Sequence, residues 1–294
     1  MSDPRAEDVR TRPPVRSWFG PRDYSPAVIR NRLFLMAGIG LALLALNSVS
    51  TNPRFQWPVV GEYLFDPVVL QGFATTLWLT ATVMAIGVLL GIALALMGLS
   101  ANTSLRSFSA AYIWFFRGTP VLVQLIFWYN LAALYPSYSI GIPFTGTVFF
   151  QGSFNDLITP YTAALLGLGL NEGAYMAEIV RAGLESVPAG QRDATKALGL
   201  NRWLTMRLVV LPQAMRFIVP PTGNQTIGML KGTSIVSMVA LHDLLYSVQI
   251  IYSRTFQTIP LLLVACFWYL VATTLLSLVQ RRIEQHYSKG YGAR

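Results

Sequence analysis

The sequence predicts an all-α integral membrane protein with about six transmembrane helices and both termini in the cytoplasm. Of its 294 residues, 53% are hydrophobic and only 12% are charged, whereas a typical soluble domain has ~25% charged residues. The mean hydropathy is +0.49. Long uncharged apolar runs recur along the chain, and Lys and Arg gather at their ends. This composition supplies too little polar surface for a water-soluble globule.

Composition also bears on partners. The net charge of +9 does not indicate nucleic acid, because the basic residues flank apolar runs and act there as topology signals. Cys266 is the single cysteine, so an intramolecular disulfide is impossible. We expect membrane lipid around the protein and no bound nucleic acid.

Six runs are long enough to cross a bilayer, which needs ~20 apolar residues in a helix. They lie near 33–50, 70–97, 112–135, 161–181, 209–231 and 258–280. The first is expected to be a retained helix, because a long charged segment precedes it and no signal cleavage site follows. We expect the fifth to be broken, because it contains Pro212, Pro220 and Pro221.

Positive residues indicate which side of the membrane each loop occupies. The first 32 residues contain seven Arg, and Lys and Arg also follow the sixth run. The loop 136–160 has neither, and its Pro and Gly residues predict irregular turns on the outer side. Six spans with both termini inside satisfy this alternation.

The loop between the fourth and fifth spans, residues 185–212, is patterned too regularly for a linker. Pro188 suits a first helical turn, and Asp193 places negative charge toward the start of a helix. Gly199 tolerates the left-handed geometry that ends a helix. A stripe of small and apolar residues at helical spacing lies between Asp193 and Gly199, and it consists of Ala194, Ala197 and Leu198.

A second amphipathic stretch follows Gly199, so the loop predicts two short helices on the cytoplasmic face. Its apolar residues are Trp203, Leu204, Met206 and Leu208. Two interpretations remain open. Either the helices pack against another protein surface, or they rest on lipid headgroups with Arg202 and Arg207 as anchors.

The same loop resembles the cytoplasmic signature of the permease subunits of ATP-binding-cassette importers. That signature is Glu-Ala-Ala, three residues, Gly, nine residues, and Ile-x-Leu-Pro. Its places here hold Asp193-Ala194-Thr195, Gly199 and residues 209–212 with the same spacing. The departures, Asp for Glu, Thr for the second Ala and Val for Ile, keep the acidic and small-apolar characters.

Other motifs resemble one branch of that family, the permeases of polar amino acids. Residues 116–120 read Phe-Arg-Gly-Thr-Pro, residues 174–181 read Ala-Tyr-Met-Ala-Glu-Ile-Val-Arg, and residues 231–234 read Lys-Gly-Thr-Ser. The resemblance covers about residues 67–285 and leaves the first span unexplained.

The resemblance implies the permease subunit of an ATP-driven importer of polar or charged amino acids in the bacterial cytoplasmic (inner) membrane. Its partners would be a cytoplasmic ATPase dimer, a second permease, identical or homologous, and an extracytoplasmic amino-acid-binding protein. The loop 185–212 would be the coupling loop. The implied ATPase contacts are Gln191, Asp193, Ala194, Ala197 and Gly199.

The expected organisation has four parts. These are a basic cytoplasmic tail at 1–32, an additional transmembrane helix and outer loop at 33–66, a permease domain at 67–285 and a cytoplasmic tail at 286–294. The chain has no phosphate-binding Gly-x-x-x-x-Gly-Lys-Ser/Thr motif, so we expect no enzymatic activity and no cofactor of its own, with ATP held by partner subunits. His242 and His286 stand alone, and no metal site is expected.

Polar residues at membrane depth are candidates for the substrate pathway, because a charge there is costly and usually functional. The candidates are Asn171, Glu172, Asn224, Gln225 and Lys231. Glu172 is expected to contact a bound amino or guanidino group, or to pair with a fixed partner such as Lys231, unless the fourth span is misplaced. Its carboxylate suits a cationic substrate or the α-amino group that all amino acids share. The broken fifth span is a candidate gate.

Two further sets of residues have structural interpretations. Glu178 and Arg181, three residues apart, are expected to balance each other's charge on one helix. Gly87, Gly91 and Gly98 predict close helix packing, within the chain or with a second permease.

Two other function classes fit parts of the sequence. An ion-gradient-driven secondary transporter of amino acids would also have a buried carboxylate and a broken span, but has no need of the coupling loop. A membrane scaffold would use that loop to dock a partner, and Glu172 and Lys231 would then have to pair internally. The identity of the amino acid, and of the second permease, stays open.

Overall fold

The computed structural model describes residues 26–142 and 148–288. It divides into two compact units, Met1–Phe55 and Gln56–Arg294, and each is described by itself. Most of the predicted amino-terminal tail and of the carboxy-terminal tail lies outside the described residues.

The first unit consists of α1 (Pro26–Thr51) and the short 3-10 helix η1 (Pro53–Phe55). The apolar stretch Arg30–Thr51 has no buried residue. A helix that is apolar all round and unburied is the form a lone membrane span takes. The additional first helix therefore exists, and its start lies upstream of the predicted residue 33.

The second unit contains helices and one hairpin. Its elements are α2 (Trp57–Tyr63), α3 (Pro67–Gly98), α4 (Thr103–Gly118), α5 (Val121–Tyr129), α6 (Leu131–Leu134), β1 (Ser137–Gly141), β2 (Val148–Ser153), α7 (Phe154–Leu157), α8 (Pro160–Glu185), α9 (Ala189–Ala197), α10 (Arg202–Thr205), the π-helix η2 (Met206–Val210), α11 (Leu211–Gly232), the 3-10 helix η3 (Thr233–Val239), α12 (Leu244–Thr255) and α13 (Thr258–Ser288).

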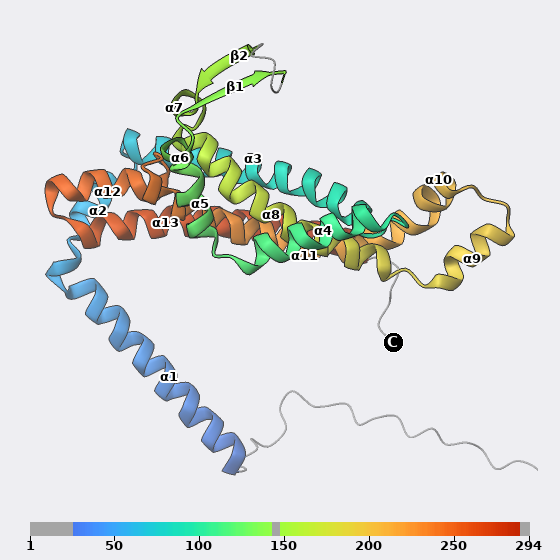
Figure 1. Cartoon of the computed structure of the whole chain (residues 1–294). Helices are drawn as coiled ribbons and strands as arrows, with labels where there is room; N and C mark the ends of the chain where they lie inside the picture. Colours follow the sequence, from blue (N-terminus) through green and yellow to red (C-terminus); the bar gives the residue numbers. More distant parts are fainter. Residues whose placement is uncertain (1–25, 143–147, 289–294) are drawn as a thin grey trace, which may run out of the picture. The chain divides into compact units, whose positions relative to one another are not determined.

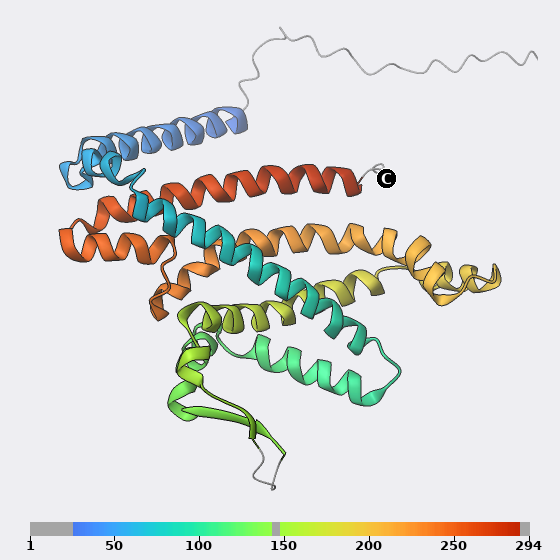
Figure 2. The ribbon, with the colours of Figure 1, turned by 90° about the horizontal axis from the view of Figure 1, so that it is seen from above.

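Helices α3 and α8 form the centre of the second unit and run side by side (Figures 1 and 2). A Cβ added at Gly87 would lie 2.5 Å from Glu172 Cγ, and one added at Gly91 would overlap Met176. Glycine lets two helix backbones approach this closely. At these two positions the predicted close packing is formed within the chain.

The segment predicted as a third span near 112–135 is not one straight helix. The chain instead forms α4 and α5, which meet at an angle of 98°. Pro120 precedes the first residue of α5, and Thr119 is extended, with φ −115° and ψ 142°. A residue before proline is pushed out of the helical region, so α4 ends at Gly118. Asn102 caps its start by accepting a hydrogen bond from Ser104 N at 2.9 Å.

The outer loop 136–160 is more regular than predicted. Strands β1 and β2 pair antiparallel, with Ser137 opposite Ser153 and Ile140 opposite Phe150. Irregular turns were expected because Pro and Gly recur in the segment, yet Ser, Tyr and Phe between them favour strands. Both views place this hairpin toward the α12 end of the second unit, away from α9 and α10 (Figures 1 and 2).

The fifth span is not broken at its prolines, contrary to the prediction. Pro212 is the second residue of α11 and comes directly after the π-helix η2, and Pro220 and Pro221 lie inside the continuous helix. The amide of Gln280 in α13 donates to the carbonyl oxygen of Pro220 at 3.2 Å. A proline removes the donor to the carbonyl four residues earlier, so this bond to Pro220's own carbonyl connects α13 to α11 and does not replace a lost helical bond.

The number of spans is partly settled in the described part of the chain. Helices α1, α3 and α13 are long and apolar enough to cross a membrane, and two bent pairs, α4–α5 and α11–α12, raise the number to five. Helix α8, with Asn171 and Glu172 near its centre, is not among them, but its 26 residues extend about 39 Å. The count of six and the side of each terminus stay predictions.

Candidate functional site

Glu172 is one of two fully buried carboxylate residues among the described residues, at 1% exposed, the other being Asp243 at 0%. It lies in α8 and its Oε2 accepts a hydrogen bond from Gln225 Nε2 of α11 at 3.0 Å. Its other oxygen, Oε1, is out of contact with solvent and has no hydrogen-bond partner in the part of the chain that the structure describes. The Glu172 carboxylate, which can accept several hydrogen bonds, therefore receives one, from the neutral amide of Gln225.

The position of Glu172 depends on α3. Gly87 leaves the space that the carboxylate stem occupies, because a Cβ there would lie 2.5 Å from Glu172 Cγ and 2.9 Å from Glu172 Cβ. Three helices, α3, α8 and α11, therefore enclose this group. We call Glu172 and Gln225 the buried acid pair.

Asn171, one residue earlier, serves a different neighbour. Its Nδ2 donates to Phe116 O at 2.7 Å and to Gln124 Oε1 at 3.4 Å. Gln124 Nε2 in turn donates to Phe116 O and to Thr119 O. These carbonyls end α4 and have no helical partner, so Asn171 and Gln124 satisfy the open backbone at the bend.

The other two pathway candidates lie apart from the buried acid pair. Asn224 is exposed and its Oδ1 accepts from Gln280 Nε2 at 3.0 Å. Lys231 is exposed and forms no ion pair within the described ranges. The fixed Glu172–Lys231 pair is therefore not formed, and Gln225 takes that place.

The coupling loop has the two predicted helices. Helix α9 ends where Gly199 adopts φ +69°, and α10 with the π-helix follows. Gln191, Asp193, Ala194 and Ala197 are exposed, and Leu198 is 77% exposed. The small apolar stripe is therefore open for docking, on an α9 that lies at one end of the second unit (Figures 1 and 2).

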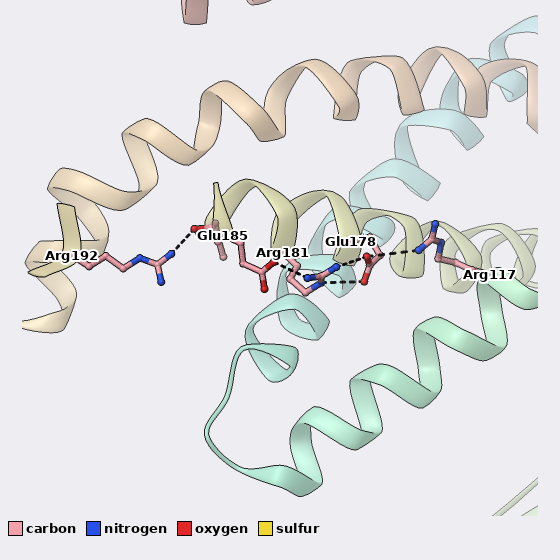
Figure 3. A network of polar contacts seen from close by, with 6 residues as sticks. Arg117, Glu178, Arg181, Glu185 and Arg192 are labelled. Carbon is pink, nitrogen blue, oxygen red and sulfur yellow. Dashed lines mark hydrogen bonds and ion pairs between the residues drawn. The ribbon is translucent and has the colours of Figure 1, made fainter. Parts of the chain in front are cut away.

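A chain of charged side chains runs along α8 toward α9 (Figure 3). Arg181 contacts Glu178 at 2.7 Å and Glu185 at 2.8 Å, and Arg117 of α4 lies 3.9 Å from Glu178. The expected charge balance between Glu178 and Arg181 is confirmed. All four side chains are partly exposed, so each pair adds little stability.

Arg192 of α9 completes this arrangement. Its Nη2 donates to the carbonyl oxygen of Leu184 in the last turn of α8 (Figure 3). Sequence reasoning missed this residue and Gln124. No spacing rule identifies either, because each bonds a backbone carbonyl that only the folded turn brings near.

Two hollows lie near these residues. One, about 730 Å³ in volume, lies between α3, α8, α11 and α13 and is lined almost wholly by apolar side chains, among them Val88, Met176 and Leu276. The other, about 810 Å³, adjoins the start of α9 and includes Gln191 and Arg281. The buried acid pair lines neither of them.

Comparisons with known proteins agree with the loop signature. Residues 87–289 match the family described as the inner membrane component of binding-protein-dependent transport systems. The chain belongs to this family. It is the permease subunit of an ATP-binding-cassette importer, an inner-membrane transport component, and ATP is hydrolysed by separate subunits. The predicted family, the helical membrane fold, the transport function and the membrane location are therefore confirmed. The alternatives of a secondary transporter and of a membrane scaffold are not supported.

Individual relatives share most of the permease. An arginine transport system permease protein from Corynebacterium glutamicum is 44% identical over 261 residues, covering 87% of this chain and 80% of its own length. A glutamine transport system permease protein from Escherichia coli K12 is 34% identical over 237 residues, covering 79% and 97%. A crystal structure of an amino acid ABC transporter with histidines has a TM-score of 0.64 at 34% identity and covers 76% and 95%.

The described residues contain no group of three or more His, Cys, Asp or Glu side chains that could hold a metal ion. Cys266 is exposed on α13.

Proposed function

We propose that this permease imports a cationic amino acid and that Glu172 receives the positive group of the substrate. The observation that carries the proposal is the buried carboxylate whose Oε1 has no partner among the described residues. The similarity to an arginine transport system permease supports the same substrate class.

Electrostatics favours a cation at this place. A carboxylate at membrane depth costs ~2.5–3.5 kcal/mol on insertion scales. Gln225 offers a hydrogen bond but no charge. An ammonium or guanidinium would neutralise the carboxylate and also donate to its open oxygen, a contact worth ~1.5–3 kcal/mol. Hydrogen bonds of this kind to an ionised partner are shorter and stronger than neutral ones.

The proposed partners are two cytoplasmic ATPase subunits, a second permease, identical or homologous, and an external amino-acid-binding protein. Helix α9 would enter a cleft on the ATPase with its exposed stripe, Ala194, Ala197 and Leu198. Gln191 and Asp193 would supply polar contacts at the rim. Small side chains suit such a contact, because they allow the helix backbone to approach the partner closely.

The test is purification of the permease with its ATPase and binding protein, followed by measurement of ATP hydrolysis with each of the twenty amino acids. Arginine or lysine should stimulate hydrolysis and uptake most. Glu172→Gln should lower the uptake of these two more than that of any neutral amino acid. Glu62→Gln, which removes an exposed carboxylate, is the matched control. Equal loss for neutral and cationic substrates would contradict the role of Glu172.

A further inference from the structure

Helix α9 has two faces with different neighbours. Asp193, Ala194 and Ala197 are exposed, whereas Arg192 is half-buried and Thr195 is 3% exposed. Residues three apart share a face of a helix, so Arg192 and Thr195 form one side that turns back to the protein. The opposite side is the one presented to the cytoplasm.

The inward face is held by polar contacts. Thr195 Oγ1 accepts a hydrogen bond from Thr205 Oγ1 at 3.1 Å and donates to Arg192 O at 2.7 Å. Arg192 Nη2 donates to Leu184 O, eight residues earlier in the chain. Thus Thr195 joins α9 to α10, and Arg192 joins α9 to α8.

Apolar packing does not make this connection. The cluster beneath the loop joins α8 to the start of α11 and contains Leu184, Val187, Val210 and Ala214. Within the described part of the chain, it takes no side chain from α9. The orientation of α9 relative to α8 therefore depends on its hydrogen bonds and on its contact with η2.

Arg192 occupies a place suited to a cation. The last carbonyls of a helix lack intrahelical partners and carry partial negative charge. Leu184 O is one of these, because α8 ends at Glu185. The guanidinium binds this end, and its Nε is withdrawn from solvent with no partner among the described residues. Such an enclosed side chain restricts rotation between the two helices.

We infer that Arg192 is a positioning residue that makes α9 and α8 move as one body. The inference rests on the proposed docking of α9 into an ATPase. Helix α8 also carries Glu172, about 18 Å from Leu184 along the helix. A displacement of α9 would then reach the buried acid pair through α8, and would reach α4 through Arg117 and Glu178.

The first experiment measures how firmly α9 is held in the full chain without an ATPase. Cys266 is the single cysteine, so Cys266→Ser with Ala197→Cys allows one spin label on the exposed face of α9. In lipid nanodiscs, Arg192→Met should raise the mobility of the label. Arg202→Met removes another exposed arginine of the same loop and should leave it unchanged. Unchanged mobility in Arg192→Met, or an equal rise in both variants, would overturn the inference.

The second experiment measures coupling in proteoliposomes that contain the permease, its ATPase and the binding protein. Arg192→Met should lower uptake per ATP hydrolysed by roughly tenfold, the factor expected when one hydrogen bond from a charged donor is lost. Arg192→Lys keeps a charged donor and should recover part of the ratio. Wild-type ratios in Arg192→Met would overturn the inference.

The two experiments separate failure of the inference from failure of the proposed function. If the wild-type complex shows no ATP-driven uptake, the proposed function fails, and label mobility still decides whether Arg192 holds α9. If Arg192→Met does not assemble, Arg192→Gln provides the same comparison with a shorter polar side chain.

Discussion

Asn171 and Glu172 show how two adjacent polar residues of one helix take different tasks. Successive side chains of an α-helix point about 100° apart. Asn171 therefore reaches the bend between α4 and α5, while Glu172 faces α3 and α11. The sequence identifies both as costly groups at membrane depth, but only the packed helices show which backbone or side chain each one meets.

Gln225 should be required for the stability of the buried acid pair. Gln225→Met removes the hydrogen bond to Glu172 Oε2 and leaves a buried carboxylate without a donor, which costs ~1–3 kcal/mol. We expect a lower unfolding temperature in detergent, with part of the loss recovered by excess arginine. Gln71→Met, at an exposed position, is the control. Equal unfolding temperatures for the two variants would contradict the prediction.

At the scale of elements, the turn between α9 and α10 requires a left-handed backbone at Gly199. Gly199 has φ +69° and open space around it, so a side chain there meets a conformational rather than a packing penalty. A β-branched residue is a genuine outlier at positive φ, whereas Asn is tolerated. The predicted helix stop at Gly199 is confirmed for this reason.

Gly199→Val should uncouple transport while insertion into the membrane stays intact. The left-handed backbone costs a branched residue ~1–2 kcal/mol, which would shift α9 away from its docking position. Gly199→Asn should retain most of the uptake per ATP. Uptake per ATP in proteoliposomes measures the effect, and a normal ratio for Gly199→Val would rule out this role of the turn.

Gly87→Ala should destabilise the contact between α3 and α8. The added Cβ would come within 2.5 Å of Glu172 Cγ, and overpacking of this kind costs ~1–3 kcal/mol. Thermal unfolding in detergent should show the loss. Gly40→Ala in α1 adds a Cβ with nothing within 4 Å and should change nothing. A similar unfolding temperature for both variants would show that α3 can retreat from α8 without cost.

Elements with long apolar runs were predictable from the sequence, and bends were not. Helices α3, α8 and α13 include the predicted runs near 70–97, 161–181 and 258–280. The third span was expected to be straight, but the chain bends at Pro120. The fifth was expected to be broken, but α11 continues through Pro220 and Pro221. Proline changes the local hydrogen bonds in both cases, but neighbouring helices decide whether the chain bends.

At the scale of the whole molecule, the amino-terminal unit lies outside the stretch that the family model matches. The family match begins at residue 87, and Met1–Phe55 forms a unit of its own. The residues described as the buried acid pair and the coupling loop all lie in the second unit. The sequence predicted a boundary near residue 67, where the resemblance begins, whereas the structure divides after Phe55. The partners of each site residue could be found only from the packed helices.

Removal of residues 1–55 should leave a folded and active permease. Between residues 56 and 105 there is no Lys or Arg, so nothing in this stretch should retain its start in the cytoplasm. We expect the truncated chain to keep ATP-driven uptake with its ATPase and binding protein. Protease accessibility of the coupling loop in membrane vesicles controls for orientation. Correctly oriented protein that has lost uptake would assign the first helix a part in transport.

The bend at Pro120 also constrains biogenesis. Helix α5 has nine residues and extends only about 14 Å, whereas the hydrocarbon layer is ~30 Å thick. Released alone from the translocon, it would expose both of its ends to acyl chains. We expect this segment to stay in the lateral gate until α8 has been synthesised, so that Asn171 can cover the exposed carbonyls. Crosslinking of stalled nascent chains to the translocon, before and after synthesis of α8, would reveal such a delay.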